Sequence, residues 1–124
     1  MHPANFSVNI PQAGPISLLD VSGSLTSFEI GALRESIFRL LKQGRKNIVL
    51  NLSALQYLDS SGIGELARVY VSVVKAAGQM KVIGLSRKVE EILKLTQLHQ
   101  VFQVFPSDEA ALQSFPESGG KETI

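Results

Sequence analysis

The sequence contains no cysteine, and neither positive nor negative charge dominates its 124 residues. Without cysteine it can form no disulfide framework, no thiolate metal site and no cysteine nucleophile. The net charge is +1, and no basic run is longer than the pairs Arg45-Lys46 and Arg87-Lys88. Because nucleic acid is bound by a concentrated positive surface, this composition gives no indication of nucleic-acid binding.

Two further features are missing: the charged and apolar regions of a signal peptide, and any apolar run of membrane-spanning length. We therefore expect a cytoplasmic protein that does not insert into a membrane, an expectation that leaves docking on a membrane partner open. Hydrophobic residues make up 44% of the chain and charged residues 19%, which is typical of a globular protein. The length predicts one domain over residues 1–124, with its core at about 6–115 and a flexible tail at 116–124.

Apolar residues recur along the chain with the periods of strands and helices in alternation. The predicted strands cover residues 6–10, 16–21, 47–52, 80–85 and 101–105, and the first two form a hairpin. The predicted helices cover residues 28–43 (capped by Ser27), 61–77, a segment after the cap Ser86, and a segment opened by Ser107. This alternation predicts an α/β fold with a mixed central sheet of about five strands, largely parallel at its centre, and about four helices.

The helix predicted at residues 61–77 has an apolar stripe that should face the core. Its members are Ile63, Leu66, Ala67, Tyr70, Val74 and Ala77. Val69 lies off this stripe and is therefore predicted to face solvent. Together with Glu65, Arg68 and Ser72, it indicates an exposed side of the helix on which a partner could dock.

The densest group of polar residues is Asp59-Ser60-Ser61-Gly62-Ile63-Gly64, at the start of this helix. One interpretation is structural: Asp59 or Ser60 is an N-cap that accepts hydrogen bonds from unpaired N–H groups. The other is functional: a serine hydroxyl is exposed beside the positive end of the helix. A phosphate group would be tolerated best there, with a stabilisation of about 0.3–1 kcal/mol.

Catalysis is not indicated by this motif. Asp-Ser-Ser-Gly differs from the Gly-x-Ser-x-Gly of a nucleophile elbow, and the only histidines, His2 and His99, are not placed by any local pattern beside Ser61. The pair Gly62-x-Gly64 lacks the residues that complete a nucleotide-binding loop. No cluster of histidines or carboxylates has metal-ligand spacing. We therefore expect no catalytic residue, no metal and no cofactor.

Three segments, taken in order, resemble the STAS domains of bacterial anti-sigma-factor antagonists. They are Asn47-Ile-Val-Leu-Asn-Leu-Ser53, Leu58-Asp-Ser-Ser-Gly-Ile-Gly64 and Gly78-Gln-Met-Lys-Val82. The later Leu95-Thr-Gln-Leu98 also looks like that family, and the resemblance covers about residues 6–115. It implies a non-enzymatic domain that binds a kinase-type anti-sigma factor and so frees a sigma factor. It also implies that the kinase phosphorylates Ser61, the serine directly before glycine, and that a phosphatase reverses this.

The resemblance also implies a partner surface around the helix start, and leaves homodimer formation open. The predicted contacts are Thr26, Asp59, Ser60, Gly62, Glu65, Arg68, Val69 and Ser72. One departure concerns Gly23-Ser24-Leu25-Thr26, where the family often has an acid in place of Thr26. A hydroxyl keeps hydrogen bonding but not charge, so recognition by the kinase could differ here. Three alternatives stay open: a STAS subunit of a membrane transport assembly, a stress-signalling scaffold, and a serine-dependent enzyme.

Overall fold

The structure of the chain is a computed structural model, and it describes residues 6–9, 14–26 and 30–115. The strands are β1 (Phe6–Asn9), β2 (Ile16–Leu25), β3 (Asn47–Leu58), β4 (Gln79–Ile83) and β5 (Gln103–Phe105). The helices are α1 (Ile30–Lys42), α2 (Ser60–Lys75), α3 (Arg87–Leu95) and α4 (Asp108–Gln113), with a 3₁₀ turn at Leu98–Gln100. The predicted cap Ser27 and the predicted flexible tail at 116–124 lie outside the described residues.

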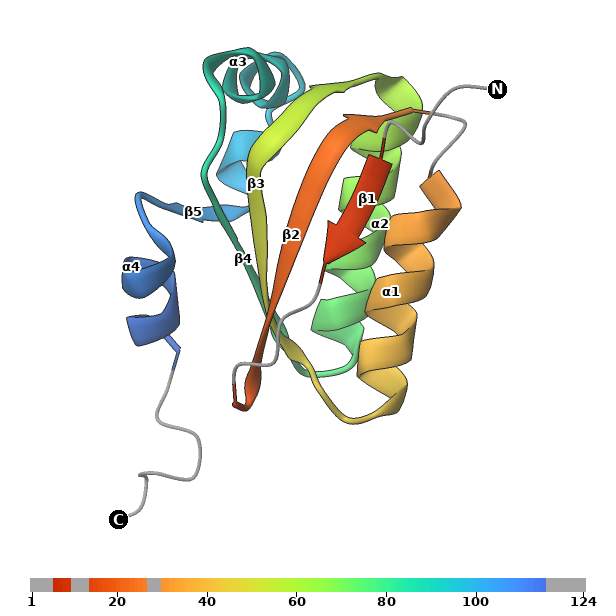
Figure 1. The fold of residues 1–124 in the computed structure, drawn as a ribbon, viewed down its shortest axis with the longest axis vertical. Coiled ribbons are helices and arrows are strands. Elements are labelled where there is room, and N and C mark those ends of the chain that lie inside the picture. Colours follow the sequence, from red (N-terminus) through yellow and green to blue (C-terminus); the bar gives the residue numbers. More distant parts are fainter. Residues whose placement is uncertain (1–5, 10–13, 27–29, 116–124) are drawn as a thin grey trace.

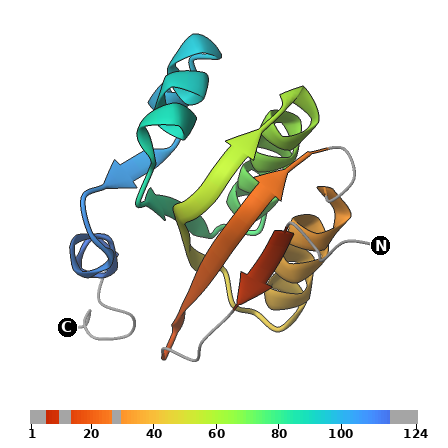
Figure 2. The same ribbon diagram turned by 45° about the horizontal axis from the view of Figure 1, so that its top comes forward.

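The strands form one sheet in the order β1-β2-β3-β4-β5 (Figures 1 and 2). Strands β2 to β5 run parallel, so the parallel part of the sheet has four strands. Strand β1 pairs antiparallel with β2, which confirms the predicted hairpin. The α/β class and the four helices are confirmed as well. Because parallel strands need crossover connections, α1 and α2 both begin at the edge of the sheet where β2 and β3 end.

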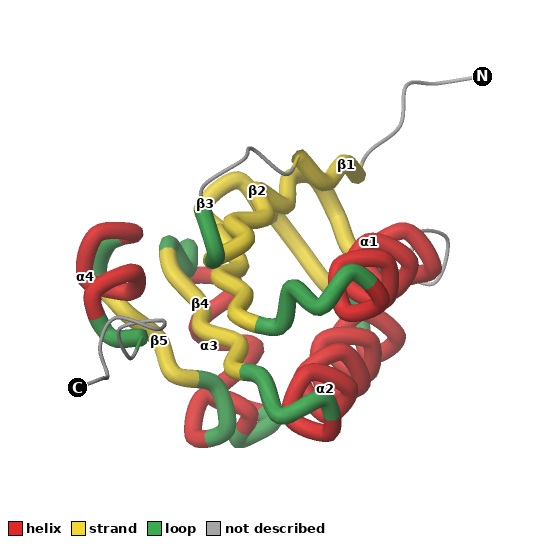
Figure 3. Tube along the Cα trace, turned by 90° about the horizontal axis from the view of Figure 1, so that it is seen from below, coloured by secondary structure: helices red, strands yellow, loops and turns green. Residues whose placement is uncertain are grey.

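The helices are divided between the two faces of the sheet (Figure 3). The main core lies between one face and the helices α1, α2 and α3, and it includes Leu33, Leu66 and Leu93. A smaller cluster on the other face joins Val49 and Ile83 of the sheet to Ala111 and Phe115 around α4. Strand β3 therefore contributes apolar residues to both faces, which accounts for its continuous apolar run from Ile48 to Leu50.

Strand β3 is longer than predicted. Residues 53–58, which lie beyond the strand predicted at 47–52, continue the strand, and Leu55 and Leu58 are buried in the main core. The buried positions Leu52, Leu55 and Leu58 are three residues apart, because each of two register shifts against β2 adds one residue to β3. The alternation by which a strand is predicted is therefore absent here. Strand β2 extends equally far, to Leu25, through two register shifts. The extra length brings the ends of both strands to the start of α2.

The buried stripe of α2 matches the predicted one only in part: Leu66 is buried, and Ile63 and Tyr70 pack partly buried against the main core. Its buried members are Gly62, Glu65, Leu66, Val69 and Val73. Val69 is 0% exposed and Glu65 is also fully buried, so the prediction that they face solvent is wrong. Val74, predicted to be in the core, is 49% exposed. Two of the buried positions, Gly62 and Glu65, carry no apolar side chain. The spacing of the apolar residues therefore predicted a stripe that lies about one residue away from the true one.

A buried lysine holds the second cluster together. The ammonium group of Lys81 in β4 donates to Oε1 of Gln103 at 2.7 Å. It also lies 5.3 Å from the ring centroid of Phe105 and 4.8 Å from that of Phe115. Burial lowers the pKa of Lys81, because the charged form loses hydration. The cation thereby ties β4 to β5 and to the residues after α4.

Candidate functional site at the start of helix α2

Asp59 is the N-cap of α2. Its backbone is extended, and its Oδ1 accepts a hydrogen bond from the N–H of Gly62 at 2.9 Å. Its carbonyl accepts the first intrahelical hydrogen bond, from Ile63, also at 2.9 Å. The structural interpretation is therefore confirmed for Asp59. Since Asp59 caps the helix, neither Ser60 nor Ser61 is needed for that purpose.

Neither serine hydroxyl takes part in capping α2. Ser60 is exposed and Ser61 is half-buried. Among the described residues, neither side chain has a hydrogen-bond partner. Both stand on the first turn of α2, where the unpaired N–H groups give the helix its partial positive charge. A phosphate bound to either oxygen would therefore meet a favourable field.

Gly62 fixes the start of the helix against the end of β2. A Cβ atom at this position would overlap the carbonyl oxygen of Leu25, and the N–H of Asp59 donates to the same oxygen at 3.3 Å. Gly62 is thus buried as a packing residue, which corrects its prediction as a partner contact. Thr26 is half-buried and follows Leu25 directly, so the position where the family often has an acid lies next to the residue that contacts the helix start.

We predict that Gly62→Ala lowers the free energy of unfolding by about 3 kcal/mol, because the overlap forces β2 and α2 apart. Gly64→Ala is the matched control, since its Cβ would lie 3.7 Å from the nearest atoms of Arg68, an ordinary contact distance. Alanine is a better helix former than glycine by about 0.5–1 kcal/mol, so this control should be neutral or stabilising. Urea unfolding of both variants measures the difference. Equal stability of the two variants would contradict the packing role of Gly62.

Glu65 connects the two long helices instead of facing a partner. Its Oε2 accepts a hydrogen bond from the backbone N–H of Arg34, the fifth residue of α1, at 3.0 Å. Its Oε1 lies 3.7 Å from the guanidinium of Arg68, a side chain that is 61% exposed. The buried carboxylate thus fixes the relative positions of α1 and α2. It also holds one end of Arg68 at the surface.

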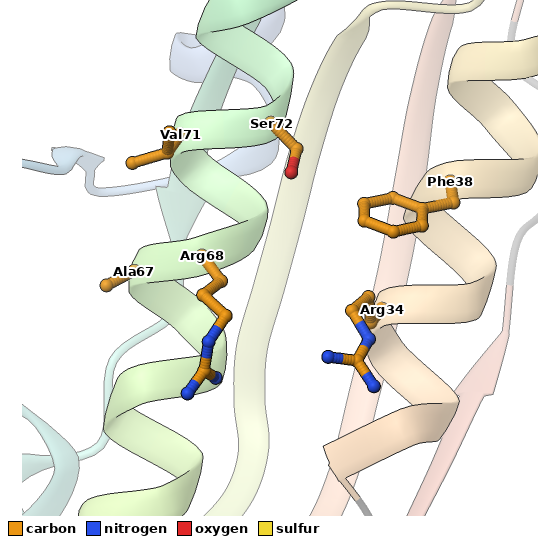
Figure 4. Close-up of a pocket in the computed structure, with 6 residues that line it drawn as sticks. All are labelled: Arg34, Phe38, Ala67, Arg68, Val71 and Ser72. Carbon is orange, nitrogen blue, oxygen red and sulfur yellow. The ribbon is translucent and has the colours of Figure 1, made fainter.

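Arg68 and Ser72, both predicted partner contacts, line a groove between α1 and α2 with a volume of about 450 Å³. The other lining residues are Arg34, Phe38, Ala67 and Val71 (Figure 4). Sequence reasoning missed Arg34 and Phe38. The available signal was Phe38 itself: it follows the buried Ile37, so it is an aromatic residue outside the buried stripe of α1. The groove is therefore a surface feature that neither helix reveals alone.

In the described part of the chain, no three histidine or acidic side chains come together as metal ligands. The Nδ1 atom of His99, in the 3₁₀ turn, is buried without a hydrogen-bond partner there, so it makes no hydrogen bond to Ser61. Among the helices that the structure describes, none has the length and apolar character to cross a membrane. The site is thus a surface of hydroxyl, guanidinium and apolar groups around the start of α2.

Comparisons with known proteins agree with this arrangement. Residues 7–111 match the family model of the STAS domain, which confirms the resemblance. The chain is 24% identical to the anti-sigma-B factor antagonist of Bacillus subtilis (strain 168), over 88% of this chain and 99% of the relative. It is 23% identical to the anti-sigma F factor antagonist of Paenibacillus polymyxa, over 87% and 93% of the two chains. The crystal structure of an anti-sigma factor antagonist from Mycobacterium paratuberculosis superimposes with a TM-score of 0.77 at 25% identity, covering 88% of this chain and 92% of that one.

Proposed function

The chain belongs to the STAS domain family, and on that premise we propose that it is a non-enzymatic anti-sigma-factor antagonist. It binds a kinase-type anti-sigma factor in the cytoplasm and so releases a sigma factor. Phosphorylation of Ser61 ends the binding, and a phosphatase restores it. The observation that carries the proposal is the Ser61 hydroxyl: it stands on the first turn of α2 and is spared from capping because Asp59 caps the helix. Relatives that bear the antagonist name align over almost the whole domain.

The surroundings of Ser61 suit a modification that leaves the fold intact. A phosphate adds about −1.5 to −2 charges at pH 7. The helix dipole stabilises that charge by about 0.3–1 kcal/mol, and the nearby carboxylate of Asp59 offsets part of this gain. The domain's own stability should therefore change little. Phosphorylation instead changes the charge of the surface at the start of α2, which the partner contacts.

The partner surface is smaller than the predicted set of contacts. Thr26, Asp59, Ser60, Arg68 and Ser72 remain in it, because they lie at or near the surface around Ser61 and the groove. Gly62, Glu65 and Val69 are buried and act by holding α2 in place. The loss of the family's acid at Thr26 bears on how well the kinase recognises this surface.

Phosphopeptide mapping tests the acceptor. We expect that incubation with ATP and the anti-sigma kinase encoded in the same genome modifies Ser61, because its hydroxyl is unused and directly precedes Gly62. Ser60→Ala should still be phosphorylated and Ser61→Ala should not. Modification at Ser60 instead would move the acceptor by one residue. Modification at neither serine, with kinase that is active on another substrate, would favour a STAS subunit of a transport assembly or a scaffold.

A further inference from the structure

The groove between α1 and α2 combines an apolar lining with two cations. Phe38 is 42% exposed and Val71 is 48% exposed, so their side chains offer apolar surface to a ligand. The guanidinium groups of Arg34 and Arg68 lie on opposite sides of the same opening (Figure 4). Among the described residues, no carboxylate lies within ion-pair distance of the Arg34 guanidinium, and Arg68 has only the 3.7 Å contact with Glu65.

Positive charge is concentrated on these two helices. They carry five basic and two acidic residues, whereas the whole chain has a net charge of only +1. The basic residues are Arg34, Arg39, Lys42, Arg68 and Lys75, and the acidic ones are Glu35 and Glu65. One of the two acids, Glu65, is fully buried, and its Oε2 accepts a hydrogen bond from the backbone N–H of Arg34. The surface between the helices is therefore complementary to a ligand that is acidic and partly apolar.

On helix α2, the groove residues Arg68 and Ser72 lie on the same side as Ser61. Residues on an α-helix are about 100° apart, so Ser61, Arg68 and Ser72 fall within about 40° of one another around α2. The arginines lie nearer to the starts of the two helices, and Phe38 and Ser72 lie one turn further along (Figure 4). The Arg68 guanidinium lies beside Gly64, one turn after Ser61. A segment lying in the groove thus presents its acidic part toward Ser61.

We propose that this groove binds an acidic, amphipathic helix of the anti-sigma factor, with partner carboxylates on Arg34 and Arg68 and partner apolar side chains on Phe38 and Val71. A helix that binds in a groove contacts it through side chains three and four residues apart. This spacing suits a groove in which the charged and the apolar side chains lie one helical turn apart. A phosphate on Ser61 would repel the partner's carboxylates and compete with them for Arg68. The identity of the partner rests on the proposed function, whereas the chemistry of the groove does not.

Charge reversal tests the groove. Arg34→Glu and Arg68→Glu should each weaken binding of the purified anti-sigma kinase by about tenfold to hundredfold, since hydrogen bonds between charged groups are lost and repulsion is added. Arg39→Glu is the matched control: it makes the same charge change on an exposed arginine of α1 that does not line the groove, and it should weaken binding less than about threefold. Calorimetric titration gives the affinities. Thermal melts of these variants and of Arg68→Gln distinguish a loss of partner binding from a loss of stability that follows when the cation beside Glu65 is removed.

Three outcomes would overturn the inference. Unchanged affinity in both groove variants would mean that the partner binds elsewhere. An equal loss of affinity in Arg39→Glu would mean that the overall positive charge of the helices, and not the groove, determines binding. A dimer in the absence of kinase that Arg34→Glu and Arg68→Glu dissociate would assign the groove to a second copy of the chain. If Ser61→Asp abolishes binding while the groove variants bind normally, the proposed function stands and only the groove fails. If the wild-type protein does not bind the kinase at all, the proposed function fails first.

Discussion

Val69→Asp should unfold the domain, whereas the same substitution at Val74 should leave it folded. Val69 is 0% exposed on α2 and belongs to the main core. Its replacement loses about 1.5–3 kcal/mol of apolar burial. The new carboxylate must also be buried without a partner or take up a proton, and either adds several kcal/mol. Since domains of this size are stable by only about 5–15 kcal/mol, most of the margin disappears.

Val74 is a stringent control, because it lies five residues away on the same helix and is 49% exposed. An aspartate there is near the C-terminal end of α2, where the helix dipole disfavours it by about 0.3–1 kcal/mol. Even so, Val74→Asp should lose no more than about 1–2 kcal/mol in total. Circular dichroism melts of both variants provide the comparison. A folded Val69→Asp together with an unfolded Val74→Asp would restore the stripe that the sequence predicted.

The error in α2 shows where apolar spacing stops being informative. Leu66 was predicted to be buried and is buried, because it lies at the edge where the predicted stripe and the buried arc overlap. The position of that arc around the helix depends on how close α2 comes to β2 and α1. Gly62 allows one approach and Glu65 bridges the other, and neither has an apolar side chain. Tertiary contacts made by a glycine and a carboxylate therefore set the rotation of the helix.

Local signals were more reliable, since they depend on few neighbours. Ser86 and Ser107 were predicted as caps, and their hydroxyls accept hydrogen bonds from Val89 and Ala110. Asp59 was predicted as one of two candidate caps and is the cap. The groove between α1 and α2 could not be predicted in this way. Its lining residues come from helices that meet only after the chain has passed through β3.

Ser61→Asp should weaken binding of the anti-sigma factor by a hundredfold or more, while Ser61→Ala should bind like the wild type and resist inactivation by the kinase. The aspartate carries one charge and is thus an imperfect mimic of phosphoserine. At the interface, a buried unpaired charge costs several kcal/mol, and each 1.4 kcal/mol corresponds to about tenfold in affinity. Authentic phosphorylation should have a larger effect than the aspartate, because it adds more charge and more bulk.

The fold should survive both substitutions, because the Ser61 hydroxyl makes no hydrogen bond among the described residues and the helix start tolerates negative charge. Ser60→Asp is the matched control. It places the same charge one residue earlier, about 100° around the helix from the line that joins Ser61 to Arg68. We expect its affinity to fall by less than that of Ser61→Asp. Calorimetry with the anti-sigma factor, supported by thermal melts, measures all three variants. Equal affinity for the unmodified and phosphorylated proteins would mean that this STAS domain is not a phosphorylation switch, and a transport-assembly subunit would then be the better explanation of the same fold.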